Sequence, residues 1–584
     1  MVGRRRVIPV ALVVVSLATP LIAQRGAGAP QGPFQQGAAG RFGTPARDAG
    51  QATAGTAVIR GRVLTAESGT PVRRAQVRAT SAEARAGRLA TTDAQGRFEL
   101  KDLPAGRWIL TASKAGLVTL QYGQRRPLES GKAIEIRDGE TLERADISLP
   151  RGSAITGHVY DEFGDAVAGA RIQVLRFQMQ QGVRRLVPAG GGDQTDDTGA
   201  FRVFGLAPGE YFVSATLRSG PGADGADGTT YAPTYYPGTG SLAEAQRVAL
   251  SVSQEQGNVN FALLPVRTVR VSGVALNSAG ENLSGAAVTL SPSGDGALAF
   301  NLGANGGRVR SDGTFTVTNV TPGSYTLTVA SGGPGGGRRG GGPPGVSEAE
   351  FATMPLLVGS EDLTGIAVVT AKGASLSGTV VVAEEASGEL KTSGLQVVAQ
   401  GTRPDLPGPF TANRNARVGD DAAFVMTGLS GQRLLRLNGL PQGWTLKAVT
   451  VDSSDVTDSP MDFRGNEQIG NVQIVVTDRV TEVNGKVVSG GQPARDYSVV
   501  LFAEDETKWT FPTRFVQTAR PDQQGLFKIR ALPPGERYLA VAVDYLENGE
   551  AADPQFLALV RGRATALTLA DGESKAVDLT LVTR

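Results

Sequence analysis

One string of residues returns four times along this chain. The copies are TTDAQGRFELKDLPAGRWILTA (91–112), TDDTGAFRVFGLAPGEYFVSATL from 195, RSDGTFTVTNVTPGSYTLTVA from 310 and PDQQGLFKIRALPPGERYLAVAV from 521. In every copy a phenylalanine lies eight residues before a glycine; the phenylalanines are Phe98, Phe201, Phe315 and Phe527. A catalytic motif does not need this fixed interval, whereas a repeated structural unit does. The string therefore predicts a fold that is copied along the chain.

Each copy has the pattern of a strand, a turn and a second strand. In the first copy the carboxylate of Asp93 can accept backbone N–H bonds within a turn, and Gly96 can adopt a positive φ without steric strain. Later copies place proline directly before glycine, as in Pro208-Gly209, which is typical of a type II turn. Apolar and polar residues then alternate over 211–217, which is the period of a half-buried β-strand.

A glycine, any residue and then an apolar residue open each predicted unit. The opening glycines are Gly61, Gly157, Gly273, Gly378 and Gly485, with spacings of 96, 116, 105 and 107 residues. A chain of 584 residues is too long for one hydrophobic core. We therefore predict five tandem modules of about a hundred residues each.

The predicted organisation follows from these openings and from the composition between them. It comprises a signal peptide (1–23), a flexible leader (24–56), module 1 (57–150), module 2 (151–265), module 3 (266–371) with a Gly-rich insertion (331–346), module 4 (372–480) and module 5 (481–584). Module 4 is degenerate, because Ala422 replaces the turn glycine and no proline precedes Gly431.

The N-terminus carries the signals of export. A basic start, MVGRRR, precedes the apolar run VIPVALVVVSLATPLIA, as in a secretory signal peptide, and Ala23 is the expected last residue before cleavage. The alternative is a membrane anchor, but the run is short for a bilayer. With no cysteine, neither disulfides nor a lipidated cysteine can hold the mature protein. We expect a periplasmic or extracellular protein with no transmembrane anchor after cleavage.

Helical signals are few. SLAEAQ (241–246) and DPQFLALVRG (553–562) are expected to form short helices. Everything else consists of short alternating runs separated by Gly/Pro turns, which is the pattern of β-sandwiches. The predicted fold class is all-β.

The Gly-x-Val opening, the Asp-x-x-Gly-x-Phe turn and the Leu-x-Pro-Gly-x-Tyr turn together resemble carboxypeptidase regulatory-like domains. The resemblance covers most of 57–584, most clearly in modules 1, 2, 3 and 5. It implies a tandem array of about five transthyretin-like (Ig-like) seven-stranded β-sandwich modules, related to Cna-B-like and starch-binding-like modules, as in multi-repeat exported bacterial proteins. In metallocarboxypeptidases this domain is an accessory beside a zinc peptidase, and no peptidase sequence is attached here.

The sequence offers little to catalysis. Its one histidine, His158, follows a module-opening glycine and is expected to be an ordinary side chain on the first strand. One histidine and no cysteine exclude a two-histidine zinc site, a convincing Ser-His-Asp triad and thiol chemistry. We therefore predict no catalytic, cofactor-binding or metal-ligating residues, no cofactor and no enzyme activity.

Two other compositional features carry weak signals. VDSSDVTD (451–458) and ADGAD (223–227) hold acidic residues but lack the spacing of a calcium loop, so we interpret them as solvated loops. The insertion PGGGRRGGGPPG (334–345) lacks the ending of a phosphate-binding loop. An RGG-like nucleic-acid segment is its distant alternative. With 58 basic against 56 acidic residues and no long basic run, nucleic acid is not an expected partner.

Aromatic clusters are the remaining candidates for a ligand site. YAPTYYPGT contains Tyr235 and Tyr236, and KWTFPTRF contains Trp509, Phe511 and Arg514. Aromatic faces can stack on sugars while guanidinium groups orient a ligand. The competing interpretation is packing within each module, and it is the favoured one for the tyrosines and for Trp509.

Two functions remain open from the sequence. The first is a non-catalytic exported scaffold for protein interaction, adhesion or spacing in the bacterial cell envelope, with envelope or extracellular proteins as partners. The second is a carbohydrate-binding protein that uses exposed aromatics on starch-binding-like modules, with polysaccharide as the partner. The sequence does not indicate an oligomeric state.

Overall fold

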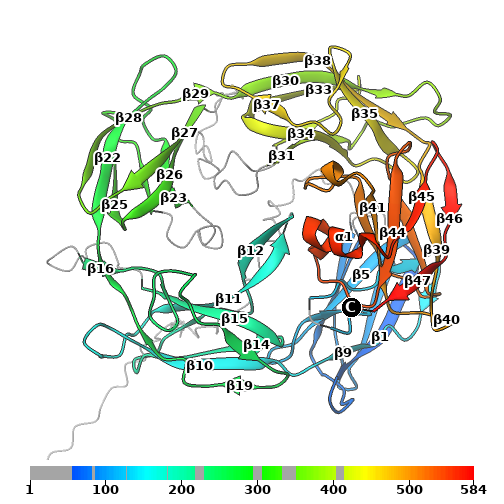
Figure 1. Ribbon diagram of the computed structural model, residues 1–584, viewed down its shortest axis with the longest axis horizontal. Helices are drawn as coiled ribbons and strands as arrows, with labels where there is room; N and C mark the ends of the chain where they lie inside the picture. Colours follow the sequence, from blue (N-terminus) through cyan, green and yellow to red (C-terminus); the bar gives the residue numbers. More distant parts are fainter. Residues whose placement is uncertain are drawn as a thin grey trace, which may run out of the picture. The chain divides into compact units, whose positions relative to one another are not determined.

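The computed structural model describes residues 55–81, 86–126, 128–180, 182–217, 229–293, 305–331, 350–402 and 414–583 (Figure 1). Strand ladders fall into five groups in chain order, within 57–149, 153–267, 269–372, 374–477 and 482–582, and we call these groups modules 1 to 5. The predicted signal peptide, nearly all of the leader and most of the Gly-rich insertion lie outside the described residues.

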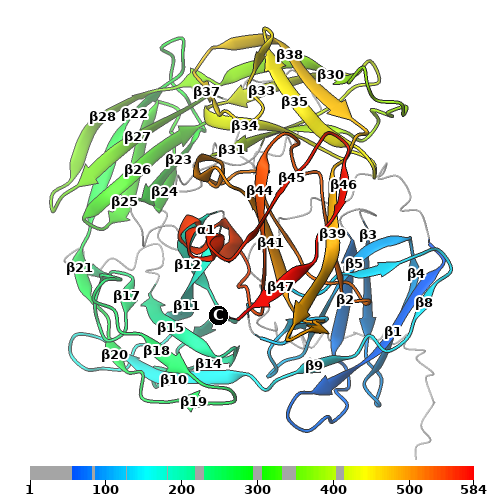
Figure 2. The ribbon, with the colours of Figure 1, turned by 45° about the vertical axis from the view of Figure 1, so that its right-hand side comes forward.

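Modules 1 and 2 each pack one sheet built on the first strand against a second sheet. In module 1 the sheets are β4-β1-β8 with β9, and β3-β2-β5-β6 with β7 (Figure 2). The strands of module 1 are β1 (Ala57–Thr65), β2 (Gln76–Ser81), β3 (Ala86–Thr91), β4 (Arg97–Leu103), β5 (Gly106–Ser113), β6 (Leu120–Gln121), β7 (Ile134–Ile136), β8 (Thr141–Leu142) and β9 (Ile147–Leu149). Those of module 2 are β10 (Ser153–Tyr160), β11 (Arg171–Gln180), β12 (Val183–Pro188), β13 (Asp193–Gln194), β14 (Ala200–Leu206), β15 (Gly209–Thr216), β16 (Thr229–Tyr231), β17 (Thr234–Tyr235), β18 (Val248–Leu250), β19 (Glu255–Gln256), β20 (Phe261–Ala262) and β21 (Pro265–Arg267).

Modules 3 and 4 repeat the two-sheet plan. The strands of module 3 are β22 (Val269–Leu276), β23 (Ala287–Pro292), β24 (Asn305–Arg308), β25 (Thr314–Val320), β26 (Gly323–Ala330), β27 (Glu350–Val358), β28 (Leu363–Val369) and β29 (Ala371–Lys372). Those of module 4 are β30 (Ala374–Val382), β31 (Gln396–Gly401), β32 (Arg414–Arg417), β33 (Ala423–Leu429), β34 (Gly431–Asn438), β35 (Thr445–Val451), β36 (Ser454–Asp455), β37 (Met461–Phe463) and β38 (Gln468–Thr477). The sheet β33-β30-β38-β35-β36 faces the sheet β32-β31-β34-β37 across the core of module 4.

Module 5 joins its sheets through β47, which pairs with both β39 and β44. Its strands are β39 (Glu482–Ser489), β40 (Gln492–Pro493), β41 (Ser498–Ala503), β42 (Val516–Ala519), β43 (Leu526–Arg530), β44 (Arg537–Val543), β45 (Thr565–Thr568), β46 (Ser574–Ala576) and β47 (Leu579–Val582). The α-helix α1 (Pro554–Arg561) and two 3₁₀ turns, η2 (Glu506–Lys508) and η3 (Glu550–Ala552), complete it. In the described part of the chain α1 is the one α-helix, so the all-β prediction is confirmed.

The repeated glycine and phenylalanine are direct cross-strand partners. Gly61 pairs with Phe98 between β1 and β4, and the same pair recurs in the four other modules as Gly157 with Phe201, Gly273 with Phe315, Gly378 with Phe424 and Gly485 with Phe527. On its other side the first strand runs parallel to the closing segment of the module. A Cβ atom on any opening glycine would lie 2.0–2.3 Å from a carbonyl oxygen of that segment. The glycine is therefore required by the close approach of two backbones, while the phenylalanine ring fills the space beside it.

The Asp-x-x-Gly turn has the expected geometry. The Asp93 carboxylate accepts the N–H groups of Gln95 at 2.9 Å and Arg97 at 2.8 Å, and Gly96 has a φ of 70°. Asp196 and Asp522 make the corresponding bonds in modules 2 and 5. The carboxylate thus accepts hydrogen bonds from backbone N–H groups that have no backbone acceptor within the turn.

After the second turn a long side chain bonds back to the turn. Tyr211 donates its hydroxyl proton to the carbonyl oxygen of Ala207, Tyr325 to that of Thr321, and Tyr538 to that of Pro533. Trp108 does the same in module 1, and the guanidinium of Arg433 replaces the aromatic ring in module 4. Each of these side chains is buried in its own module, so the motif ties the turn to the core.

Two local predictions are wrong in detail. Residues 241–246 form isolated turns, with bonds from the N–H of Glu244 to Ser241 and of Ala245 to Leu242, because six residues are too few for a stable helix. At Gly209 and Gly323 φ is 149° and 156°, far from the value near +80° of a type II turn. These two glycines are the first residues of strands β15 and β26.

The helix predicted at 553–562 is present as α1.

Candidate functional site

Trp509 lies inside module 5. Its side chain is 2% exposed, its indole N–H donates to the carbonyl oxygen of Ala503 at 2.7 Å, and its ring meets Phe502 edge to face at 5.6 Å between centroids. Phe556 and Leu557 of α1 belong to the same buried cluster. The indole has no exposed face for a sugar, and its burial supports the packing interpretation.

Arg514 fastens module 5 to module 4. Its Nε and Nη2 atoms lie 2.9–3.0 Å from the carboxylate oxygens of Asp458, and Nη1 donates to the carbonyl oxygen of Leu446 at 3.0 Å. This fork against a carboxylate is the strong, directional form of an ion pair. The guanidinium is therefore already bound to a carboxylate of the same chain.

The other two cations around Trp509 are also paired. Lys508 forms an ion pair with Glu536 and lies 5.0 Å from the centre of the Phe515 ring. Arg520 forms ion pairs with Glu129 and Asp496. Lys508 is thus paired within module 5, whereas Arg520 reaches a carboxylate of module 1.

Phe511 contacts the β11–β12 hairpin of module 2. It is partly buried, and a Cβ atom added to Gly182 at the tip of that hairpin would lie 2.9 Å from the Phe511 Cβ. Trp509, Phe511 and Arg514 therefore do not meet in one site, because each faces a different neighbour. Ligand binding by Phe511 and Arg514 stays a prediction.

Tyr235 and Tyr236 pack within module 2. Tyr235 is 7% exposed in a cluster with Leu175, Leu186 and Phe212, and this burial raises the pKa of its hydroxyl. The ring of Tyr236 meets Phe261 edge to face at 6.1 Å. The packing role favoured from the sequence agrees with these contacts, and ligand binding by either tyrosine stays a prediction.

The carboxylates of the acidic run 451–458 bind different partners. Asp455 accepts the N–H of Thr457 at 2.8 Å, and bonds from Thr457 lower the pKa of its carboxyl group. Asp458 binds Arg514, and Asp452 accepts a bond from Asn471 at 3.0 Å. Across the described residues no group of three or more His, Cys, Asp or Glu side chains forms a metal-binding cluster. The ADGAD segment and the PGGGRRGGGPPG insertion lie outside the described residues.

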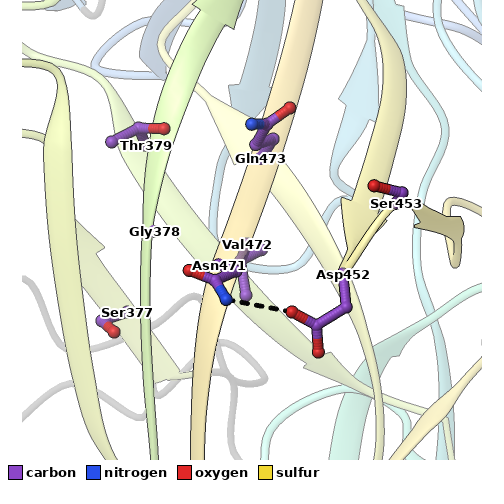
Figure 3. A pocket seen from close by; sticks show the side chains of 8 residues that line it. All are labelled: Ser377, Gly378, Thr379, Asp452, Ser453, Asn471, Val472 and Gln473. Carbon is purple, nitrogen blue, oxygen red and sulfur yellow. Dashed lines mark hydrogen bonds between the residues drawn. The ribbon is translucent and has the colours of Figure 1, made fainter.

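A polar groove on module 4 was not predicted. Its volume is about 670 Å³, and Figure 3 shows its side chains on β30, on β38 and on the turn between β35 and β36. The lining residues are Ser377, Gly378, Thr379, Asp452, Ser453, Asn471, Val472 and Gln473. Three of them adopt left-handed backbone conformations, with φ of 47° at Asp452, 68° at Ser453 and 54° at Asn471.

The groove can offer hydrogen bonds to a ligand. Its lining supplies hydroxyl and amide groups and the Asp452 carboxylate, which is held by the Asn471 amide (Figure 3). None of the lining residues is aromatic, basic or histidine. Such a surface suits a neutral polar ligand or a polar protein surface. In the sequence, the strand residues of the groove are the polar positions of an alternating polar and apolar pattern. Every solvent-exposed sheet face has this pattern, so it does not mark a groove.

Comparison with known proteins locates one family. Residues 58–150 match the family model of the carboxypeptidase regulatory-like domain, which confirms the resemblance for module 1. None of the curated proteins matches the chain.

The solved structures that match include two streptococcal pilins and the TIE protein of Bacillus anthracis. A streptococcal ancillary pilin is 14% identical, covering 54% of this chain and 98% of that one, with a TM-score of 0.21. The minor pilin GBS52 of Streptococcus agalactiae is 16% identical, covering 36% and 95%, with a TM-score of 0.21. The TIE protein of Bacillus anthracis is 13% identical, covering 73% of each chain, with a TM-score of 0.14.

Proposed function

We propose that this protein is a non-catalytic exported scaffold, in which tandem β-sandwich modules serve protein interaction, adhesion or spacing in the bacterial cell envelope. The observation that carries the proposal is the use of the segment 508–520. Its cations Lys508, Arg514 and Arg520 each bind a carboxylate of this chain, and its tryptophan is buried. Arg514 and Arg520 join module 5 to modules 4 and 1, while Lys508 and Trp509 are used within module 5.

The repeated residues point the same way. The opening glycine, its phenylalanine partner and the side chain that bonds back to the turn each have a packing or backbone role in their module. A chain that repeats structural residues and varies the rest presents several different surfaces on one kind of frame. That is the organisation expected of a scaffold.

The exported location is supported by the sequence at the N-terminus, with its basic start and apolar run before Ala23. In the described part of the chain, no helix has the length and apolar character needed to cross a membrane. The envelope is the compartment that we propose for the mature chain.

Fractionation and substrate assays test this function together. In the producing bacterium we expect the mature chain to begin near Gln24 and to be recovered outside the cytoplasm. We also expect covalent cross-linking in intact cells to join it to envelope proteins. A cytoplasmic chain with an intact N-terminus would contradict export. Turnover of a peptide or glycoside substrate by the purified protein would contradict the non-catalytic role, and binding on a polysaccharide array would favour the carbohydrate alternative.

A further inference from the structure

An ion pair joins residues 391 positions apart in the sequence. Arg520 of module 5 pairs with Glu129 of module 1, and the two side chains are 7% and 5% exposed. The same guanidinium lies 3.2 Å from Asp496 and donates to the carbonyl oxygen of Gly123 at 3.3 Å. A buried charge is strongly unfavourable without a partner, so these groups require each other.

A ring of further charges surrounds this pair. Lys132 of module 1 lies 3.0 Å from Asp496, and Arg125 also pairs with Asp496. The Arg126 guanidinium lies 5.0 Å from the centre of the Tyr545 ring and 3.9 Å from Asp544. Module 1 thus supplies three cations that meet two carboxylates and an aromatic face of module 5. The two surfaces are complementary in charge.

Backbone bonds fix the register of the same contact. Glu129 and Glu547 form an antiparallel β-bridge, and the N–H of Asn548 donates to the carbonyl oxygen of Leu128 at 2.7 Å. The side-chain Nζ of Lys132 also donates to the backbone carbonyl oxygen of Arg495 at 2.6 Å. Side-chain charge alone allows many orientations, whereas these backbone bonds select one.

We infer that residues 123–126 and 128–135 of module 1 form a docking surface whose partner is module 5 of the same chain. This contact, which we call the clasp, holds the first and last modules together. The inference goes beyond the proposed function, because the clasp forms whatever the chain binds. Its failure would leave export and the non-catalytic role untouched.

Zero-length cross-linking of the full chain tests the clasp. A carbodiimide couples an amine to a carboxylate only where the two groups touch, and Lys132 and Asp496 are partly exposed, at 18% and 21%. We expect mass spectrometry to find an amide between Lys132 and Asp496. The exposed pair Lys486 and Asp578, 3.6 Å apart within module 5, is the positive control. Lys132→Arg keeps the cation but removes the amine, and it should abolish the link.

Mixing isotope-labelled and unlabelled chains separates the possible partners. Links confined to one isotope support the clasp within a chain. Links that join labelled to unlabelled chains would overturn it in favour of a second copy. A Lys486–Asp578 link without a Lys132–Asp496 link would also overturn it.

Charge exchange provides a test that does not depend on the reagent. Arg520→Glu places like charges against Glu129 and Asp496, so we expect the Lys132–Asp496 link to fall at least tenfold. Glu129→Arg in the same chain restores one opposite pair and should recover most of the link. Hydrogen exchange in β39–β47 reports whether module 5 of each variant is folded. An unchanged link in a folded Arg520→Glu chain would contradict the clasp.

Discussion

Ala422 occupies the turn position that glycine holds in the other modules, and it has a φ of 61°. A left-handed conformation costs an alanine about 1–2 kcal/mol, and a glycine avoids this cost. Glycine also gives the unfolded chain more conformational entropy, which offsets part of the gain in stability. We therefore expect Ala422→Gly to stabilise module 4 by ~0.5–1 kcal/mol. Hydrogen exchange of the strands β30 and β33 in the full chain measures the change.

The same position in module 5 provides a matched control. Gly525 has a φ of 84°, and a Cβ atom there would make only ordinary contacts at 3.6 Å. Gly525→Ala should therefore destabilise module 5 by about 1 kcal/mol for conformational reasons alone. If both variants changed stability in the same direction, backbone conformation would not explain the repeated turn glycine.

At the scale of single elements, the first strand of each module lies between the phenylalanine-bearing strand and the closing segment. At its opening glycine these neighbours leave no room for a Cβ atom. In β10 an added Cβ at Gly157 would lie 2.0 Å from the carbonyl oxygen of Val259. We expect Gly157→Ala to destabilise module 2 by ~3 kcal/mol, the upper part of the usual range for overpacking. His158→Ala is the control on the same strand. It should stay within about 0.5 kcal/mol of the wild type, as expected for a partly exposed side chain. Hydrogen exchange of β10 and β14 measures both.

Helix α1 depends on Trp509, since Trp509, Phe556 and Leu557 share one buried cluster. Trp509→Ala should destabilise module 5 by about 3–5 kcal/mol. Trp509→Phe keeps an aromatic ring but loses the hydrogen bond to Ala503. We therefore expect it to destabilise module 5 by only about 1 kcal/mol, the usual net contribution of one hydrogen bond. Faster hydrogen exchange in 554–561 is the measurement. A Trp509→Ala chain with unchanged exchange in α1 would contradict the packing role.

Across the whole molecule, the sequence predicted what is local and missed what is distant. Turn residues such as Asp93 and Gly96 have a mechanism that acts within a few positions, so the repeats and the all-β class could be derived from them. The sequence favoured packing for Trp509 but left a ligand site open, because an aromatic residue among basic ones has the same local pattern in a core as in a binding site. The partner of Arg520 was invisible for a different reason. Glu129 lies 391 residues away in the sequence, and no local sequence pattern predicts that it pairs with Arg520.

The clasp makes a stability prediction for the molecule as a whole. Removing one member of a buried ion pair leaves the other charge uncompensated, which costs about 3–5 kcal/mol, whereas replacing both members by apolar side chains is often neutral. Arg520→Met leaves Glu129 without its partner, while Glu129→Leu leaves Arg520 with Asp496 at 3.2 Å. We therefore expect Arg520→Met to destabilise modules 1 and 5 more than Glu129→Leu does.

The double variant decides whether the pair acts as a unit across the two modules. Glu129→Leu with Arg520→Met removes both charges, so it should recover most of the stability that Arg520→Met loses. Hydrogen exchange in β1–β9 and in β39–β47 follows the two modules separately in the intact chain. Because the charges lie on different modules, a real coupling must appear in both sets of strands. If the stability losses of the two single variants simply added in the double variant, the two residues would act independently. The first and last modules would then fold independently of each other.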